Sequence, residues 1–128
     1  MDIISSYSRA DAIADGVLID AMIGDFESVS RQHYKYPVAM TAGVYEIIDR
    51  AVKAKKYCND YAGIWHDILH IAKHGRDIAG GTGKEIEVYI QRFNADPFHA
   101  QNRETFHILC GPGDNAEPVL TVMLPNED

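Results

Sequence analysis

The sequence predicts an α+β protein whose helices fill the N-terminal two thirds of the chain and pack on a small antiparallel sheet from the C-terminal third. Two patterns carry this prediction. Apolar residues recur at helical spacing between positions 41 and 75, whereas from position 85 they alternate with polar residues at a period of two. A chain of 128 residues has the usual length of one domain, so we expect a single domain over residues 1–128.

The first forty residues predict short elements. Ser8 is a good N-cap for a helix over residues 9–15, because Asp11 follows it by three positions and Gly16 tolerates the left-handed backbone that ends a helix. Residues 17–20 have the composition of a short buried strand, and residues 25–32 have weak helical character. Pro37 disfavours helical backbone at the residue before it, so we expect a break there.

Two central helices are predicted most clearly. The first begins at Thr41, and its apolar stripe consists of Val44, Ile47, Ile48, Ala51 and Val52. The second is expected to start at an Asn59 cap and to end near Gly75. Because the connection between them is short, we expect them to pack as antiparallel neighbours.

The last third predicts a sheet. A glycine-rich loop at 80–83 separates it from the helices, and a strand, a polar loop at 94–102, a second strand, a turn at 111–115 and a returning strand follow. Each strand has one apolar face to bury. The expected inner face, or its alternating neighbours, is formed by Ile86, Val88, Ile90, Phe106, Ile108, Val119 and Thr121.

Composition excludes several classes of protein. Residue 2 is acidic and no apolar run is long enough for a signal peptide or a membrane span, so we expect a cytoplasmic protein without membrane contact. The two cysteines, Cys58 and Cys110, lie far apart and outside any metal-ligand spacing, so we expect free, partly buried thiols.

Charge is distributed unevenly. The net charge is −7, and residues 85–128 carry eight acidic and two basic side chains. Phosphate contacts need clustered Lys and Arg, so we expect no direct nucleic-acid binding. An acidic face can instead attract a basic protein partner. The candidate residues for such a face are Glu85, Glu87, Asp96, Glu104, Asp114 and Glu117, with Glu127 and Asp128 near them in sequence.

Three histidines recur every fourth residue, at His66, His70 and His74, a spacing that metal sites can use. No carboxylate or thiolate follows at motif spacing, and ligands on successive turns are dispersed along the helix. We therefore predict no metal site and no cofactor. Residues 80–84 lack the spacing of a phosphate-binding loop and precede a strand instead of a helix, so a simple linker is the better interpretation.

No catalytic template is present in the sequence, and we therefore expect a binding protein rather than an enzyme. Polar residues do gather near the ends of predicted elements, where a ligand pocket could be lined. These candidate pocket residues, which capping would explain equally well, are Tyr7, Arg9, Asp11, Asp20 and Thr41.

Two strings, SYSRADAIADGVLID at 6–20 and CGPGD at 110–114 with the closing MLP, resemble a family of small bacterial proteins of unknown function. The resemblance implies an accessory gene of plasmids and integrative elements.

Three hypotheses follow. The first is an accessory protein of a mobile element, an acidic inhibitor of host defence (anti-CRISPR or anti-restriction) that binds a nucleic-acid-binding protein. The second is a small-ligand-binding protein or enzyme that uses the candidate pocket. The third is a dimeric regulatory or interaction module.

Overall fold

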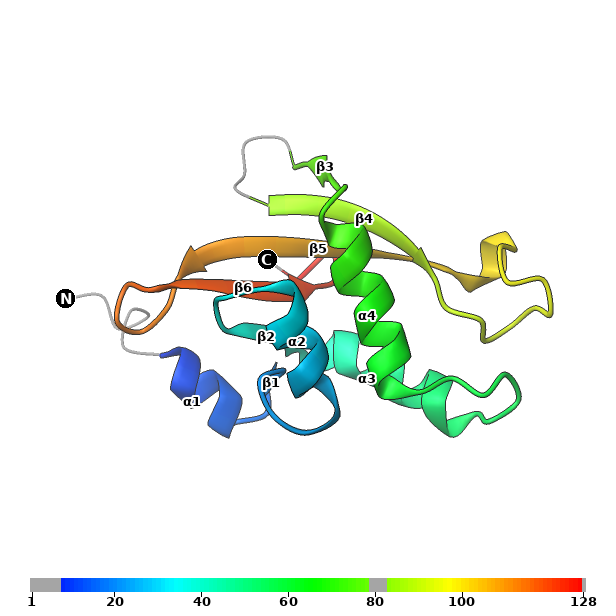
Figure 1. Cartoon of the computed structure of the whole chain (residues 1–128), viewed down its shortest axis with the longest axis horizontal. Helices are drawn as coiled ribbons and strands as arrows, with labels where there is room; N and C mark the ends of the chain where they lie inside the picture. The colour runs from blue at the N-terminus through cyan, green and yellow to red at the C-terminus, as the bar shows by residue number, and fades with distance from the viewer. Residues whose placement is uncertain (1–7, 79–82, 128) are drawn as a thin grey trace.

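A computed structural model describes residues 8–78 and 83–127, and it has the predicted α+β architecture (Figure 1). The helices are α1 (Arg9–Ala14), α2 (Glu27–His33), α3 (Ala42–Lys53) and α4 (Tyr61–Ala72), with 3-10 turns η2 (Gly24–Phe26) and η3 (Ala100–Asn102). The strands are β1 (Leu18–Asp20), β2 (Val38–Thr41), β3 (Arg76–Asp77), β4 (Gly83–Tyr89), β5 (Arg103–Pro112) and β6 (Pro118–Met123).

All these strands belong to one sheet in the order β1-β2-β6-β5-β4-β3. Neighbouring strands are antiparallel except β2 and β6, which pair in parallel. The strand expected over residues 17–20 is confirmed as β1, but the prediction of a sheet confined to the last third was too narrow, because β1, β2 and β3 all come from earlier in the chain. All four residues of β2 are buried, since the strand lies between β1 and β6 and is covered by helices. A run of four residues is too short to show a period of two.

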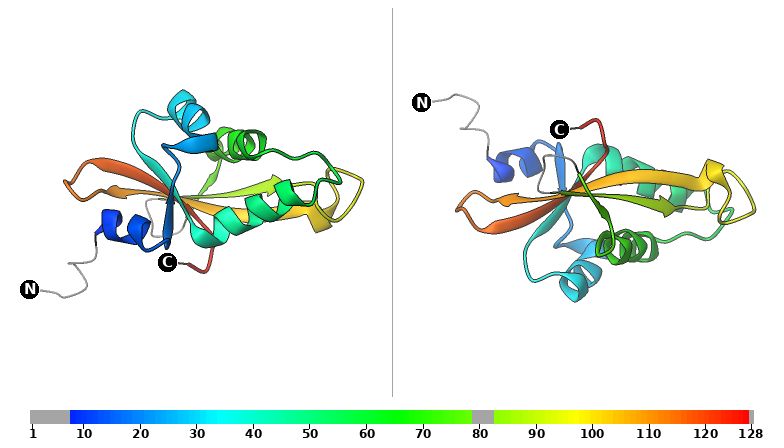
Figure 2. Two further views of the ribbon diagram at one scale, coloured as in Figure 1. Left: turned by 90° about the horizontal axis from the view of Figure 1, so that it is seen from below. Right: turned by 90° about the horizontal axis from the view of Figure 1, so that it is seen from above.

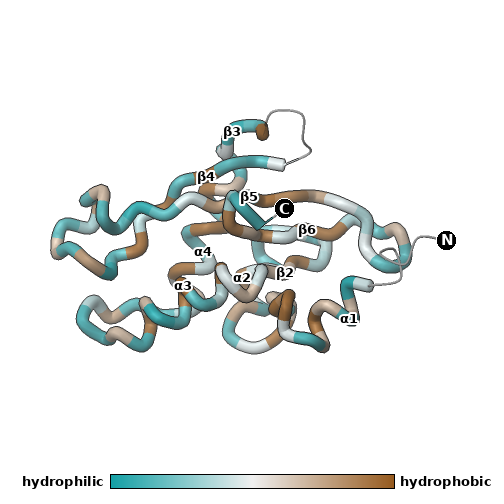
Figure 3. The backbone as a smooth tube through the Cα atoms, turned by 180° about the vertical axis from the view of Figure 1, so that it is seen from behind, coloured by the Kyte–Doolittle hydropathy of each residue, from teal (hydrophilic) through white to brown (hydrophobic). Residues whose placement is uncertain are grey.

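The main core lies on one face of the sheet. Figure 2 shows α2 and α4 together on one side of the sheet, and α1 on the other. Trp65, Ile68 and Leu69 of α4 are fully buried and pack in one cluster with Ile86, Val88, Phe106 and Ile108 of β4 and β5. The expected inner residues of these two strands are thus confirmed. Along the backbone, hydrophobic residues are frequent in β5 and β6 (Figure 3).

In β6 the other set of alternating residues faces the main core. Val122 lies opposite Ile108 in the sheet register and joins the core cluster, as does Leu120. Val119 and Thr121, which the sequence placed inward, point to the opposite face. That face is covered by α1, whose Arg9 donates a hydrogen bond to Thr121 Oγ1. Both faces of β6 are therefore covered, so alternation alone cannot indicate which set meets the main core.

Helix caps were predicted at Ser8 and Asn59, and the first is confirmed; Thr41, at which the first central helix was expected to begin, is the N-cap of α3. The Ser8 hydroxyl accepts a hydrogen bond from the Asp11 amide while the Asp11 carboxylate accepts one from the Ser8 amide, and Thr41 caps α3 through the Val44 amide. Asn59 does not cap α4, which follows Asp60. Its side-chain amide instead donates to the Gln91 carbonyl, so it ties the α3–α4 connection to the start of the loop that follows β4.

Two further expectations concern cysteines and membranes. Neither Cys58 nor Cys110 forms a disulfide bond in the described part of the chain, and both are exposed, not partly buried as predicted. Among the described residues, none of the helices has the length and apolar character needed to cross a membrane.

Candidate functional site

The connection between β4 and β5 presents aromatic side chains to solvent. We call residues 91–102 the aromatic loop; it lies at one end of the long axis of the molecule (Figure 1). Phe93 and Phe98 are 65% and 75% exposed, and Tyr89 at the adjoining end of β4 is 38% exposed. The remainder of the loop is mostly hydrophilic (Figure 3). Exposed phenylalanine side chains are unfavourable in water, and contiguous exposed apolar patches are typical of surfaces that bind other molecules.

One buried side chain holds the backbone of the aromatic loop. Asn102 is fully buried. Its Oδ1 accepts hydrogen bonds from the amides of Arg92, Phe93 and Asn94 at 2.9–3.2 Å. Its Nδ2 donates to the carbonyls of Asn94 and Asp96 at 3.0 and 2.9 Å. The loop therefore has a defined conformation although its aromatic rings are exposed.

Local contacts also fix Phe98. The Asp96 carboxylate accepts a hydrogen bond from the Phe98 amide at 3.1 Å, which closes a short turn. The Phe98 ring meets Tyr89 edge to face, with 5.6 Å between ring centroids. An aromatic pair in this arrangement restricts both side chains before any partner binds.

Phe93 stands at the edge of a groove. The guanidinium of Arg92 lies 4.7 Å from the centre of the Phe93 ring and forms a 3.0 Å ion pair with Glu104. The groove, of about 420 Å³, separates the aromatic loop from α3, and its apolar lining includes Ile47 and Leu124.

The predicted acidic residues in the strands have intramolecular partners. Glu85 contacts Arg76 and His107, and Glu87 pairs with Arg103 at 3.3 Å. The hydrogen bond from His107, with the nearby Arg76, lowers the pKa of the Glu85 carboxyl. Glu104 pairs with Arg92 and points to the face opposite Glu85 and Glu87, as the alternation in the β4–β5 register requires.

The remaining acidic candidates lie apart. Asp114 binds the amides of Arg9 and Ala10 at the start of α1, at 2.7 and 3.1 Å. Glu117 accepts a hydrogen bond from the Asn115 amide within the β5–β6 turn, and Asp96 is in the aromatic loop at the other end of the molecule (Figure 1). Glu127 accepts hydrogen bonds from Thr41 and the Leu124 amide, and Asp128 lies outside the described residues. The structure brings only Glu85 and Glu87 of this set onto one strand face.

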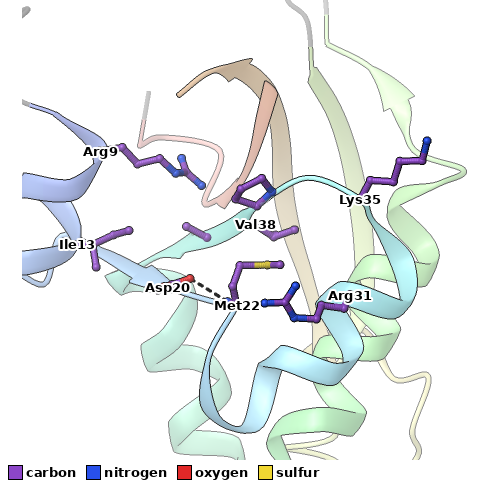
Figure 4. A pocket seen from close by; sticks show the side chains of 9 residues that line it. Arg9, Ile13, Asp20, Met22, Arg31, Lys35 and Val38 are labelled. Atoms are coloured by element: carbon purple, nitrogen blue, oxygen red, sulfur yellow. Dashed lines mark hydrogen bonds between the residues drawn. The ribbon is translucent and has the colours of Figure 1, made fainter. Parts of the chain in front are cut away.

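Two of the candidate pocket residues do come together. Arg9 and Asp20 line a pocket of about 390 Å³ between α1, β1, β2 and α2 (Figure 4). Asp11 forms the capping box of α1 and Thr41 caps α3, so both have the structural roles that the sequence left open as the alternative. Tyr7 lies outside the described residues. Sequence reasoning missed Arg31 and Lys35, which line the same pocket.

The three histidines of α4 are joined by a fourth from α2. His33 Nε2 lies 3.0 Å from His66 Nδ1, and the His66 and His70 rings stack at 5.7 Å between centroids. Within residues 8–78 and 83–127, no group of three or more potential ligands is arranged to hold a metal ion. Burial, with nearby Lys73, His66 and His70, lowers the pKa of His33.

The aromatic loop was not predicted as a site. Residues 94–102 were predicted to be a polar loop, although two phenylalanines, Phe93 and Phe98, lie within the ten residues 93–102 and binding residues are frequent on loops. The sequence does not indicate the role of Asn102, because its hydrogen-bond partners are backbone amides and carbonyls. Every residue other than proline carries both groups, whatever its side chain.

The comparisons with known proteins identify a family but no function. The chain belongs, over residues 1–128, to a family of unknown function (DUF6573). No curated protein and no solved structure matches it.

Proposed function

We propose that this protein acts by binding another protein through the aromatic loop. The observation that carries the proposal is the combination of two highly exposed phenylalanines with a backbone that forms five hydrogen bonds with the Asn102 side chain. A surface that is ordered before binding loses little conformational entropy when it docks, so its apolar area contributes directly to affinity.

Aromatic side chains are the usual energetic centre of such an interface. Burial of a phenylalanine in a partner's pocket contributes about 1.5–3 kcal/mol from apolar area alone. Phe93 adds the neighbouring groove against α3, where Ile47 and Leu124 can receive an apolar side chain of the partner. We infer that the partner offers an apolar recess for the phenylalanines and a projecting apolar residue for the groove.

The net charge of −7 supports a partner of opposite charge. A surplus of negative charge attracts a basic protein at long range and raises the association rate at low salt. The finer proposal is that this partner is a nucleic-acid-binding protein of host defence, and that the chain is an inhibitor encoded on a mobile element. Because the acidic side chains are dispersed and paired, we infer that the aromatic loop determines which partner is bound. The negative charge contributes only long-range attraction.

The test is quantitative capture from a lysate of the natural host with three forms of the protein. The first is the wild type, the second carries Phe93→Ala and Phe98→Ala, and the third carries Ile23→Ala and Tyr36→Ala. Ile23 and Tyr36 are also exposed, at 62% and 47%, but lie outside the aromatic loop. The third form therefore controls for a general loss of exposed apolar surface.

We expect to find a protein that the wild type and the control form capture in equal amounts. The loop variant should capture about tenfold less of it, or less still. Far-UV circular dichroism must show all three forms folded. Equal recovery of every captured protein by the three forms would contradict the proposal. If light scattering shows a dimer that only the loop variant dissociates, the partner is a second copy of this chain.

A further inference from the structure

The Arg9 guanidinium is half-buried and, among the described residues, forms its hydrogen bonds with neutral groups. Its guanidinium donates hydrogen bonds to Thr121 Oγ1 and to the Leu120 carbonyl, both at 2.9 Å. Both acceptors are neutral, and within the described part of the chain no carboxylate forms an ion pair with this side chain. Burial lowers the pKa of Arg9, against the opposing influence of Asp114, Asp20 and Glu117. A guanidinium has five N–H donors, and the described residues accept from two of them, so three are left for a ligand.

Two more cations line the same pocket from the opposite wall. Arg31 is in α2 and Lys35 follows the end of that helix. In Figure 4, Arg9 and Arg31 extend toward the same space from opposite sides, whereas the Lys35 side chain is directed away from it. Arg31 pairs with Glu27 at 3.1 Å, but its side chain is 61% exposed, so the pair is weakened by solvent.

The rest of the pocket is largely apolar, with one acidic group. The apolar lining residues are Ile13, Met22, Pro37, Val38 and Ala39. The acidic group is Asp20, whose carboxylate already accepts a hydrogen bond from the Met22 amide at 2.9 Å. The two arginines that extend into the pocket and the one carboxylate give it a formal surplus of one positive charge in a chain whose net charge is −7.

We propose that this pocket is a binding site for a small organic anion, whose carboxylate or phosphate group lies between Arg9 and Arg31 and whose apolar part lies on Met22 and Val38. Guanidinium groups bind both kinds of oxyanion through paired hydrogen bonds, so the two head groups share one recognition chemistry. A volume of about 390 Å³ accommodates such a molecule and is too small for a folded segment of protein.

The structure also supplies a matched control for the test. Arg50 pairs with Glu46 in α3 in the same i,i+4 arrangement as Arg31 with Glu27, but it is not part of this pocket. Arg31→Gln and Arg50→Gln therefore remove the same charge from equivalent helix positions. Arg9 is left unchanged because it holds α1 against β6, and a variant could fail to fold.

The experiment is a titration of ¹⁵N-labelled protein with sodium isovalerate and, separately, with inorganic phosphate, against sodium chloride at equal ionic strength. The resonances followed are the Arg9 and Arg31 side-chain Nε–H groups and the Met22 and Ala39 amides. With at least one anion we expect saturable chemical-shift changes that are confined to the pocket. The anion that binds with the lower Kd identifies the preferred head group. Arg31→Gln should weaken binding about tenfold, the usual cost of one charge-assisted hydrogen bond, while Arg50→Gln leaves it unchanged.

Two results would overturn the site. One is the lack of saturable shifts at these resonances with either anion at tens of millimolar. The other is an equal loss of affinity in Arg31→Gln and Arg50→Gln, which would show that the anion is attracted by overall charge and not bound at this pocket. Neither result bears on the aromatic loop, which lies at the other end of the molecule from α1 (Figure 1).

Discussion

Asn102 determines the conformation of the aromatic loop with a single amide group. We expect Asn102→Ala to lower the free energy of unfolding by about 3 kcal/mol, because three backbone amides and two carbonyls lose their partner at a buried position. Urea denaturation measures this change. Hydrogen exchange should show faster exchange of the amides of residues 92–94.

Asn102→Asp is the informative companion variant. A carboxylate still accepts from the three amides but cannot donate to the Asn94 and Asp96 carbonyls. We expect protection of residues 92–94 to be largely kept and the loss of stability to be smaller than for alanine. If both variants leave exchange at these amides unchanged, Asn102 does not order the loop.

His33 makes stability depend on pH. Its pKa is lowered in the folded protein from the ordinary value of 6.5, by burial and by Lys73, His66 and His70. Its Nδ1 is buried without a hydrogen-bond partner in the described part of the chain. The folded state therefore binds a proton less readily than the unfolded state. This contribution to stability is complete above pH 6.5 and is lost as the pH falls through the lowered folded-state pKa.

The measurement is urea denaturation at about pH 7.5 and about pH 5.5, on either side of the unfolded-state pKa of histidine. We expect the wild type to lose stability at the lower pH and His33→Gln to lose less, because glutamine has no proton to bind. Parallel pH dependence in the two proteins would show that His33 does not contribute.

At the scale of elements, α4 joins the sheet to the other helices. Ile68 is fully buried in the core cluster, so Ile68→Ala should destabilise the protein by about 2–5 kcal/mol, the range for a large-to-small change in a packed core. Ile23 is 62% exposed, and the same substitution there should cost less than about 0.5 kcal/mol. A similar loss of stability at Ile68 and Ile23 would contradict the packing of Ile68 in the core.

The elements that the sequence predicted well are those with many turns or a clear alternation. The stripe of Val44, Ile48 and Ala51 on α3 and the alternation of Ile86 and Val88 in β4 are both buried as expected. The strand β2 was missed because its neighbours β1 and β6 come from distant parts of the chain, and nothing local indicates such pairing. The pocket of Arg9 and Arg31 was only half predicted for the same reason, since residues of α1 and α2 line a common pocket only in the folded molecule.

The whole molecule is expected to unfold as one unit. The central strand β6 is paired with β2 on one side and β5 on the other, so the N-terminal and C-terminal strands share one hydrogen-bonded sheet. Trp65, the single tryptophan, is fully buried and donates a hydrogen bond to Ser30. Its fluorescence and the far-UV circular dichroism should therefore change together in urea. Separate transitions would indicate two independent units and contradict a single domain.

The place of β6 also constrains how the chain can fold during synthesis. A ribosome releases the elements in sequence order, and β2 has its partner β1 early, but its other edge waits for residues 118–123. Until those residues emerge, β2 and β5 each present an unpaired strand edge, and the helices have only part of a sheet to cover. The protein therefore acquires its complete sheet late and in one step, and a nascent chain that lacks β6 has two exposed edges available for pairing with other chains.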